Sequence, residues 1–338
     1  MRSLILVPLL VLALVPTWSG EPRLPVYNGT PKVRVERVTL DASNPARRRL
    51  GALTFLGGLH FSSPDPAFGG FSAMHVAGDR FTLLSDGGLT FAFRLGRDLV
   101  PHAYRFGALP DGPGSGWAKA DRDSESMAVD SKTGRIWVGF ENWNAIWSYA
   151  PGFARVERQA RPRAMRRWPK GGGAEAMVRL SDGRFLVFSE TKEAPKGGTL
   201  GLIFRGDPTD PAARPSRFVY QAPEGFSSTD AVELPNGRIL VLNRAFSLRQ
   251  QFTGSLTLID AGAIRPRARV LGRELARFAA PVIHDNFEAL AATREGPDTI
   301  LWIVSDDNPP SLWQRALLLK FRLDLPPRAT TKGPHSHR

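Results

Sequence analysis

Acidic residues recur at two fixed positions of a pattern that appears five times in this 338-residue chain. The first position stands just before a small residue and a large apolar residue. Its members are Ser72, Glu125, Glu175, Asp230 and Glu288. The second position follows a turn, often Gly-Arg, and a run of apolar residues. Its members are Asp86, Glu141, Glu190, Arg244 and Asp306. Since four of the five residues at each position are acidic, the repeat carries eight equivalent carboxylates.

These eight carboxylates would repel one another if the fold gathers them, and a bound cation would relieve that repulsion. Ca²⁺ takes about 6–8 oxygen ligands, whereas Mg²⁺ prefers to keep several waters. The chain has no Cys and only six His, so an oxygen-only site favours Ca²⁺, with Mg²⁺ and Mn²⁺ left open. We predict that all eight acids are metal ligands and that Glu175 also takes part in catalysis. The alternative is that the acids bond backbone N–H groups and hold neighbouring repeats together.

Basic residues stand close to these acids in the sequence. Arg166, Arg167 and Lys170 come shortly before Glu175, and Arg244 takes the place of an acid at the second position. Three glycines follow Lys170 and could let backbone N–H groups approach an anion closely. A metal ion with Lys and Arg around it is suited to binding and polarising a phosphate ester. We predict that these four basic residues bind an anionic small-molecule substrate.

His284 and Asp285 precede the fifth copy of the pattern. A histidine beside a carboxylate can act as a general base or orient a water molecule, so we predict a catalytic role for both residues. A serine nucleophile is not indicated, because no GxSxG sequence occurs. A nucleotide-binding P-loop is not indicated either, because no GxxxxGK[ST] sequence occurs.

The five copies have the hydrophobic pattern of β-strands separated by tight turns. Their first positions are 53, 50, 55 and 58 residues apart, and another apolar run follows each copy. Turn sequences such as KTG, SDG and PNG interrupt the apolar runs. Four-stranded units that recur at about 40–50 residues are typical of β-propeller blades. We therefore predict an all-β propeller with five four-stranded blades; the strand-like segment 33–40 leaves a sixth blade open.

The fifth copy begins at Glu288 and has sequence for three strands before the chain ends. We expect its fourth strand to come from residues 50–63, so that strands from both ends of the chain pair and close the ring. Closure removes an open sheet edge. In a propeller, the start of an innermost strand and the end of the next strand lie on one face, beside the axis. The two acidic positions should therefore meet at one axial opening.

The ends of the chain differ from the repeats in composition. Residues 1–19 have the order of a secretory signal peptide: one Arg, an apolar run and small residues before the expected cleavage site. We predict a periplasmic or secreted protein, with an N-terminal segment at 20–49, one domain at 50–325 and a flexible tail at 326–338. We expect no transmembrane segment after signal removal and a monomeric protein.

The net charge of +13 points to acidic partners in general. The basic residues are spread along the chain, however, and the aromatic residues are not grouped around them. Nucleic-acid binding is therefore not expected, because it usually combines a basic stripe with a recognisable motif.

The set of motifs GGFSAM, DSESMAVD, GGAEAM, FSSTDAVEL and DNFEALA resembles the phytase-like family, described as having esterase-like activity of phytase. The resemblance extends from about residue 50 to residue 323 and implies an exported bacterial β-propeller that hydrolyses phosphoric or other esters. We predict a Ca²⁺-dependent phosphoric-ester hydrolase. Two alternatives stay open: a propeller that binds a ligand or protein and holds a structural cation, and a metal-dependent lactonase or carboxylesterase.

Overall fold

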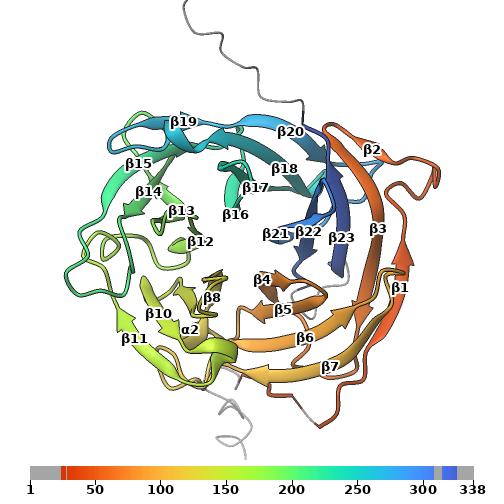
Figure 1. Cartoon of the computed structure of the whole chain (residues 1–338), viewed down its shortest axis with the longest axis horizontal. Coiled ribbons are helices and arrows are strands. Elements are labelled where there is room, and N and C mark those ends of the chain that lie inside the picture. Colours follow the sequence, from red (N-terminus) through yellow and green to blue (C-terminus); the bar gives the residue numbers. More distant parts are fainter. Residues whose placement is uncertain (1–23, 28, 308–313, 326–338) are drawn as a thin grey trace, which may run out of the picture.

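Five β-sheets form a ring around a central axis, as Figure 1 shows. The structure is a computed structural model, and it describes residues 24–27, 29–307 and 314–325. The predicted signal peptide at 1–19 and the predicted tail at 326–338 lie outside the described residues. Across the described ranges, no helix has the length and apolar character needed to span a membrane. The predicted five-bladed all-β propeller is confirmed.

The first four blades each consist of consecutive antiparallel strands, numbered from the axis outward. Blade 1 contains β4 (Phe71–Ala77), β5 (Arg80–Ser85), β6 (Leu89–Leu95) and β7 (Pro101–Ala108). Blade 2 contains β8 (Ser124–Val129), β9 (Ile136–Phe140), β10 (Ala145–Tyr149) and β11 (Val156–Ala160). Blade 3 contains β12 (Ala174–Arg179), β13 (Phe185–Glu193), β14 (Thr199–Phe204) and β15 (Ser216–Gln221), with β19 (Arg269–Leu271) parallel at its edge. Blade 4 contains β16 (Ser227–Glu233), β17 (Arg238–Ser247), β18 (Gln251–Asp260) and β20 (Arg273–Phe278).

Blade 5 is closed by strands from both ends of the chain. Its inner strands are β21 (Phe287–Glu295), β22 (Asp298–Ser305) and β23 (Ala316–Leu323), and its fourth strand is β3 (Leu53–Ser62). The pairing of Leu318 with Leu59 and of Leu323 with Leu53 confirms the predicted closure. The short strand β2 (Arg49–Leu50) also pairs with β3.

The alternative of a sixth blade is wrong. The segment that suggested it forms β1 (Arg34–Val38), which pairs with the outer edge of β3. A single strand has no hairpin partners of its own, so it adds a fifth strand to blade 5. Outside the strands, the described chain has the one-turn helix α2 (Lys119–Arg122) and the 3₁₀ turns η1 (Pro151–Phe153) and η2 (Ala261–Ala263).

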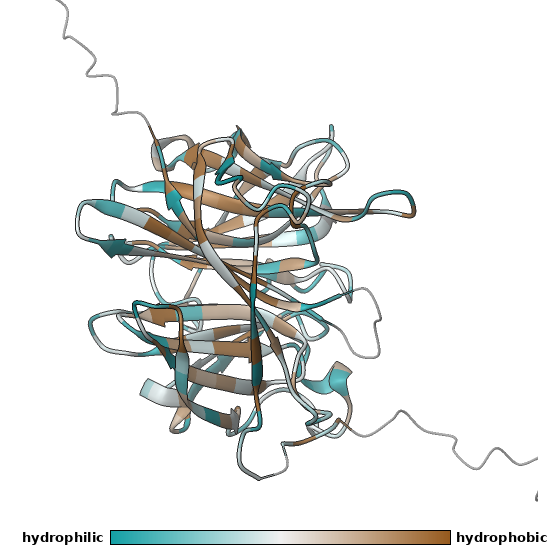
Figure 2. Ribbon diagram, turned by 90° about the vertical axis from the view of Figure 1, so that its right-hand side faces the viewer, coloured by the Kyte–Doolittle hydropathy of each residue, from teal (hydrophilic) through white to brown (hydrophobic). Residues whose placement is uncertain are grey.

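Apolar side chains fill the space between neighbouring blades. Between blades 5 and 1, the ring of Phe61 lies 5.8 Å from that of Phe91 and 5.2 Å from that of Phe93. In Figure 2 the hydrophobic colour is concentrated in the strands and the hydrophilic colour in the connecting loops. Burial of this apolar surface supplies most of the stabilisation of the ring. It also fixes the innermost strands around the axis.

Hydroxyl groups on the innermost strands connect one blade to the next. Ser126 Oγ donates to the carbonyl of Ala174 at 2.7 Å, from blade 2 to blade 3. Thr229 Oγ1 donates to the carbonyl of Phe287 at 3.1 Å, from blade 4 to blade 5. Ser72 makes the corresponding bond from blade 1 to blade 2. These buried bonds tie the innermost strands of neighbouring blades together.

The closing strand predicts a test of ring stability. Phe61 lies on β3 and is 2% exposed, so Phe61→Ala should leave a cavity where blade 5 meets blade 1. We expect the free energy of unfolding in urea to fall by about 3–5 kcal/mol. Phe246→Ala is the control, because Phe246 is 60% exposed and its loss should cost less than about 0.5 kcal/mol. Equal effects of the two substitutions would contradict the closure described here.

Candidate metal site at the propeller axis

A β-bulge in each innermost strand positions the side chain at the first acidic position. The strand pairing skips one residue in four of these strands: Ser72, Glu125, Glu175 and Glu288. A bulged residue leaves the pairing ladder and its side chain is re-aimed. In β16 the skipped residue is Thr229. Thr229 is therefore the structural equivalent of the bulged residues in the other four strands, and Asp230 is the residue that follows it. The sequence alignment of the fourth copy is therefore wrong by one residue.

Asp230 connects blade 4 to blade 5. Its Oδ2 accepts the N–H of Leu290 at 2.7 Å, and its Oδ1 accepts the N–H of Ala231 at 2.7 Å. Burial raises the pKa of Asp230 to about 8. Because both oxygens accept backbone N–H groups, Asp230 makes the contact between blades that the alternative interpretation expected of the acids.

The second position lies beside the first because β-hairpin pairing brings them together. In blade 3, Ser189 pairs with Ala174, so Glu190 follows directly where Glu175 bulges. Asp86 and Glu141 come directly after β5 and β9, and Asp306 comes directly after β22. Both sets of acids thus lie at one end of the innermost strands, and these strands surround the axis in Figure 1.

Blades 2 and 3 bring five carboxylates into a continuous group, here called the axial acid cluster. Carboxylate oxygens of Asp123, Glu125 and Glu141 lie within 4.8 Å of one another. Oxygens of Glu141, Glu175 and Glu190 also lie within 4.8 Å of one another, so Glu141 belongs to both groups. Four of these residues were predicted as ligands. Asp123 was not predicted, because an acid at this place occurs in only one copy of the repeat. The Asp-x-Glu spacing in the sequence DSES could have indicated a second carboxylate beside Glu125.

Burial and mutual repulsion hold protons on this cluster. Burial, with repulsion from Asp123 and Glu190, raises the pKa of Glu141 to about 8. Burial, with repulsion from neighbouring carboxylates, raises the pKa of Glu125 and of Glu175 well above the usual range. Deprotonation at neutral pH therefore requires a compensating positive charge.

Arg244 supplies part of that charge from the second position of blade 4. Its guanidinium lies 3.0 Å from Glu190 and 3.9 Å from Glu175, and it also forms an ion pair with Glu288. Burial opposes the charge on Arg244, but Glu288, Glu175 and Glu190 together raise its pKa. Burial raises the pKa of Glu288 to about 7, with Arg244 opposing that rise. Arg244 was predicted to bind substrate, and the structure places it among the acids as their counter-ion.

The remaining ring acids have other partners. Asp86 forms an ion pair with Lys119, which α2 positions. Asp306 accepts a hydrogen bond from Asn286 Nδ2 at 3.3 Å. Among the described side chains, no Lys or Arg lies within ion-pair distance of Asp123, Glu125 or Glu141. The charge of Lys119 acts on Asp123 and Glu125 without an ion pair to either, so the three acids are only partly compensated. Their oxygen-only donor set is the one that a hard divalent cation such as Ca²⁺ requires.

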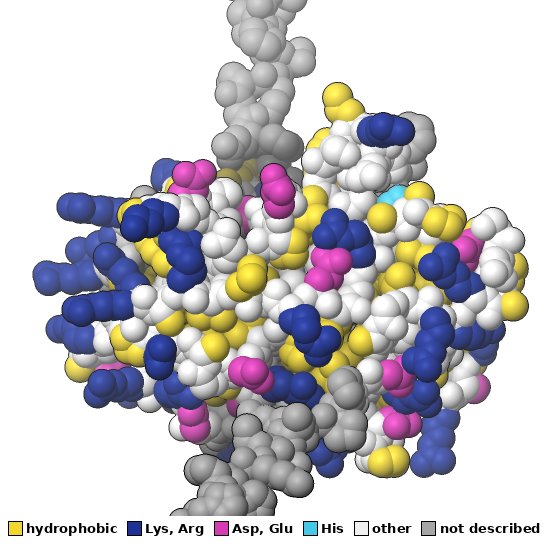
Figure 3. Space-filling model, turned by 90° about the horizontal axis from the view of Figure 1, so that it is seen from above, with side chains coloured by type: hydrophobic (Ala, Val, Ile, Leu, Met, Phe, Trp, Pro, Cys, Tyr) yellow, Lys and Arg dark blue, Asp and Glu magenta, His cyan; other side chains and the backbone are white. Residues whose placement is uncertain are grey.

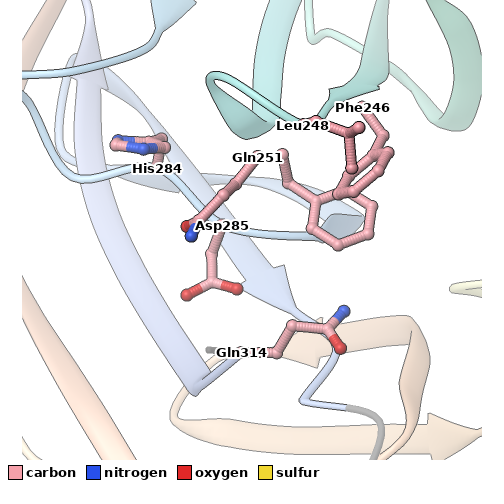
Figure 4. Close-up of a pocket in the computed structure, with 7 residues that line it drawn as sticks. Phe246, Leu248, Gln251, His284, Asp285 and Gln314 are labelled. Atoms are coloured by element: carbon pink, nitrogen blue, oxygen red, sulfur yellow. The ribbon is translucent and has the colours of Figure 1, made fainter. Parts of the chain in front are cut away.

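His284 and Asp285 line a pocket of about 460 Å³ beside this site (Figure 4). The facing wall carries Phe246 and Leu248 from the projecting end of the β17–β18 hairpin. His284 Nδ1 lies 2.8 Å from the carbonyl oxygen of Val282, so Nδ1 is the donor, and in the neutral form of the ring Nε2 is an acceptor.

Asp285 has a different partner. Its carboxylate accepts a hydrogen bond from Arg315 Nε at 3.1 Å, so the structure does not join His284 and Asp285 into a hydrogen-bonded pair. The pocket borders the acids through Arg244. The guanidinium of Arg244 lies 6.0 Å from the ring of Phe252 in the pocket wall and donates a hydrogen bond to Asn286 Oδ1 at 2.8 Å.

The loop before β12 does not bring its basic residues to the acids. No described hydrogen bond or ion pair joins Arg166, Arg167 or Lys170 to a carboxylate of the ring. Gly173 of this loop contacts a carboxylate of the cluster instead of an external anion: its N–H donates to Glu141 Oε1 at 3.2 Å. A Cβ atom on Gly173 would lie 2.8 Å from the carbonyl oxygen of Glu141, so glycine is required for this approach.

The fold and the site define a five-bladed propeller with an acidic cluster at one end of its axis. A family model described as "Phytase-like: Esterase-like activity of phytase" matches residues 66–309, and the chain belongs to this family. No curated protein matches the sequence.

Solved structures similar to this chain have low sequence identity. Kuenenia stuttgartiensis hydrazine synthase is 10% identical with a TM-score of 0.36; 72% of this chain aligns, covering 58% of that chain, which is less than two thirds of its length. The Malassezia sympodialis allergen Mala s 1 is 12% identical with a TM-score of 0.40 and coverages of 95% and 100%. A luciferin-regenerating enzyme is 10% identical with a TM-score of 0.42 and coverages of 85% and 95%.

The raised pKa values predict how stability depends on pH without added metal. The folded state keeps protons on Glu141 and Asp230 up to pH about 8, whereas the unfolded chain releases them near the ordinary values of 4.5 and 3.8. Unfolding therefore releases protons between these limits, and the free energy of unfolding falls as pH rises. We expect the urea midpoint in EDTA to fall steadily from pH 5 to pH 8 and Ca²⁺ to restore it. A midpoint that rises over this range would contradict the assignment.

Proposed function

We propose that this protein is a metal-dependent phosphoric-ester hydrolase that uses the axial acid cluster. The observation that carries the proposal is the excess of buried carboxylate there. Asp123, Glu125 and Glu141 crowd within 4.8 Å without a described Lys or Arg at ion-pair distance. A bound cation would offset the free-energy cost of burying these carboxylates together. Membership of the phytase-like family supports ester hydrolysis.

The metal ligands would come from blades 2 and 3. Asp123, Glu125, Glu141, Glu175 and Glu190 offer the oxygen donors, and Ca²⁺ is the preferred ion. Such an ion supplies Lewis-acid chemistry, because it polarises an ester oxygen and lowers the pKa of bound water. Glu175 would then act as a ligand and hold the neighbouring Arg244 in position.

Two side chains outside the cluster would act on the substrate. Arg244 lies between the acids and the pocket, so an anionic ester group entering from the pocket meets its guanidinium. His284 lines the same pocket and keeps Nε2 free of the bond to Val282, so it can accept a proton from an attacking water. Asp285, paired with Arg315, would position the loop that carries His284.

A second candidate is hydrolysis of a carboxylic ester or lactone. The apolar wall of the pocket favours it, because Phe246 is 60% exposed and Leu248 is 95% exposed. Exposed apolar side chains at a pocket mouth commonly bind an apolar ligand group. A phosphate ester of a strongly polar alcohol would not use this wall.

Calcium titration by calorimetry tests the metal site. Glu125→Gln removes one charged ligand, so we expect Ca²⁺ affinity to fall at least about tenfold, equivalent to about 1.4 kcal/mol. Glu224→Gln is the control, because Glu224 is exposed and distant in sequence from the cluster. Asp230→Asn should keep Ca²⁺ binding, since Asp230 bonds backbone N–H groups. Wild-type protein that binds none of Ca²⁺, Mg²⁺ and Mn²⁺ would sink the proposal.

Hydrolysis of two chromogenic substrates separates the candidate reactions. We expect p-nitrophenyl phosphate to be hydrolysed with Ca²⁺ and not with EDTA, and His284→Gln to lower kcat by about 10²–10⁴. Replacing Phe246 and Leu248 with Ala should raise KM only for p-nitrophenyl butyrate. Faster hydrolysis of the butyrate would favour the carboxylesterase. Binding of Ca²⁺ without hydrolysis of either ester would leave a ligand-binding propeller with a structural cation.

A further inference from the structure

A second charged feature lies on the outer edge of the propeller, between blades 2 and 3. A groove of about 1220 Å³ runs there beside the end of β11 and the start of β15. Figure 3 shows Lys and Arg side chains projecting from the left-hand edge, the side on which Figure 1 places β11 and β15. Six exposed arginines line the groove: Arg161, Arg163, Arg166, Arg214, Arg217 and Arg267.

The charge of these arginines is not compensated within the described chain. No ion pair joins any of the six to a described carboxylate. Glu157 and Asp207, which are close in sequence to the groove residues, pair with Arg135 instead, at 2.5 Å and 3.3 Å. Asp210 lines the groove, but its Oδ1 accepts the N–H of Ala212 at 2.8 Å. The groove therefore concentrates about five net positive charges in a concave surface.

The walls of the groove are held by backbone contacts and by proline. Five prolines line it: Pro162, Pro208, Pro211, Pro215 and Pro266. The N–H of Arg267 donates to the carbonyl of Arg217 at 2.7 Å, which ties the segment before β19 to the start of β15. Arg214 donates to the carbonyls of Pro211 and Ala213 at 3.0 Å each. A surface held in this way loses little conformational entropy when a ligand binds.

From this arrangement we propose that the groove binds a linear anion that carries several phosphate or sulfate groups. Guanidinium groups bind phosphate and sulfate oxygens through paired, charge-assisted hydrogen bonds. No Phe, Tyr or Trp lines the groove itself. Trp143 and Trp147 line the adjoining pocket that shares Arg161, and the guanidinium of Arg161 lies 5.7 Å from the ring of Trp143. Base stacking is therefore confined to that neighbouring pocket, and the groove favours an anion without bases. The site is separate from the axial acid cluster and does not depend on a metal. Arg166 would then bind an anion at the outer edge of the propeller, and not beside the axial acids as the sequence predicted.

Calorimetry at low salt with two probes tests the site in the full-length protein. Tripolyphosphate and a sulfated tetrasaccharide distinguish a phosphate source from a glycan source. We expect one or both to bind, and the triple variant Arg163→Gln/Arg217→Gln/Arg267→Gln to lower affinity at least about tenfold. The matched control Arg48→Gln/Arg97→Gln/Arg249→Gln removes the same charge from exposed positions outside the groove. It should lower affinity no more than about twofold.

Three results would overturn the proposal: no binding of either probe, equal losses in the two triple variants, and an oligothymidylate of equal charge that binds as tightly as tripolyphosphate. Thermal midpoints check that the variants fold. If the triple variant unfolds, Arg163→Gln alone, on an exposed side chain, should still weaken binding measurably. EDTA should leave this binding unchanged while it abolishes Ca²⁺ binding at the axis, so failure of one site is distinguishable from failure of the other.

Discussion

Negative charge buried around the axis is the constraint on which the rest of this structure depends. Five strands converge there, and the bulge in each turns a side chain out of the pairing ladder. In blades 1 and 4 that side chain is a hydroxyl, which bonds the next blade at no cost in charge. In blades 2, 3 and 5 it is a glutamate, which must be protonated, paired with a cation or bound to a metal.

The ring meets this constraint unevenly around its circumference. On the side of blades 4 and 5, Arg244 neutralises Glu288 and reaches Glu190, and Asp230 accepts backbone N–H groups. On the side of blades 2 and 3, the acids outnumber the cations. Burial raises carboxyl pKa values on both sides, and on the side of blades 2 and 3 repulsion between neighbouring carboxylates adds to the rise. An added divalent cation is the simplest way to relieve that repulsion. The asymmetry favours the side of blades 2 and 3 for the proposed metal, whereas the pocket with His284 adjoins Arg244 on the side of blades 4 and 5.

Much of the fold could be predicted because propellers repeat in sequence as they do in space. The period of the repeat identified five blades, and the missing fourth strand of blade 5 pointed to β3. The segment that forms β1 left a sixth blade open, because strand propensity does not say which edge a strand will join. Asp230 was aligned one residue off because a bulge leaves no mark in a run of polar residues such as SSTD. The path of the loop carrying Arg166 could not be predicted, since glycine and proline specify turns and not the direction in which the loop runs. The roles given to His284, Asp285 and the eight acids stay predictions.

Proton release during Ca²⁺ binding tests the central claim most directly. If Ca²⁺ and protons compete for Glu125, Glu141 and Glu175, adding Ca²⁺ at pH 7 to unbuffered protein must displace protons, since the pKa of Glu141 lies near 8. A pH-stat should record about one or more protons released per bound ion, with less release at higher pH. Binding of Ca²⁺ without proton release would place the ion elsewhere and contradict the account.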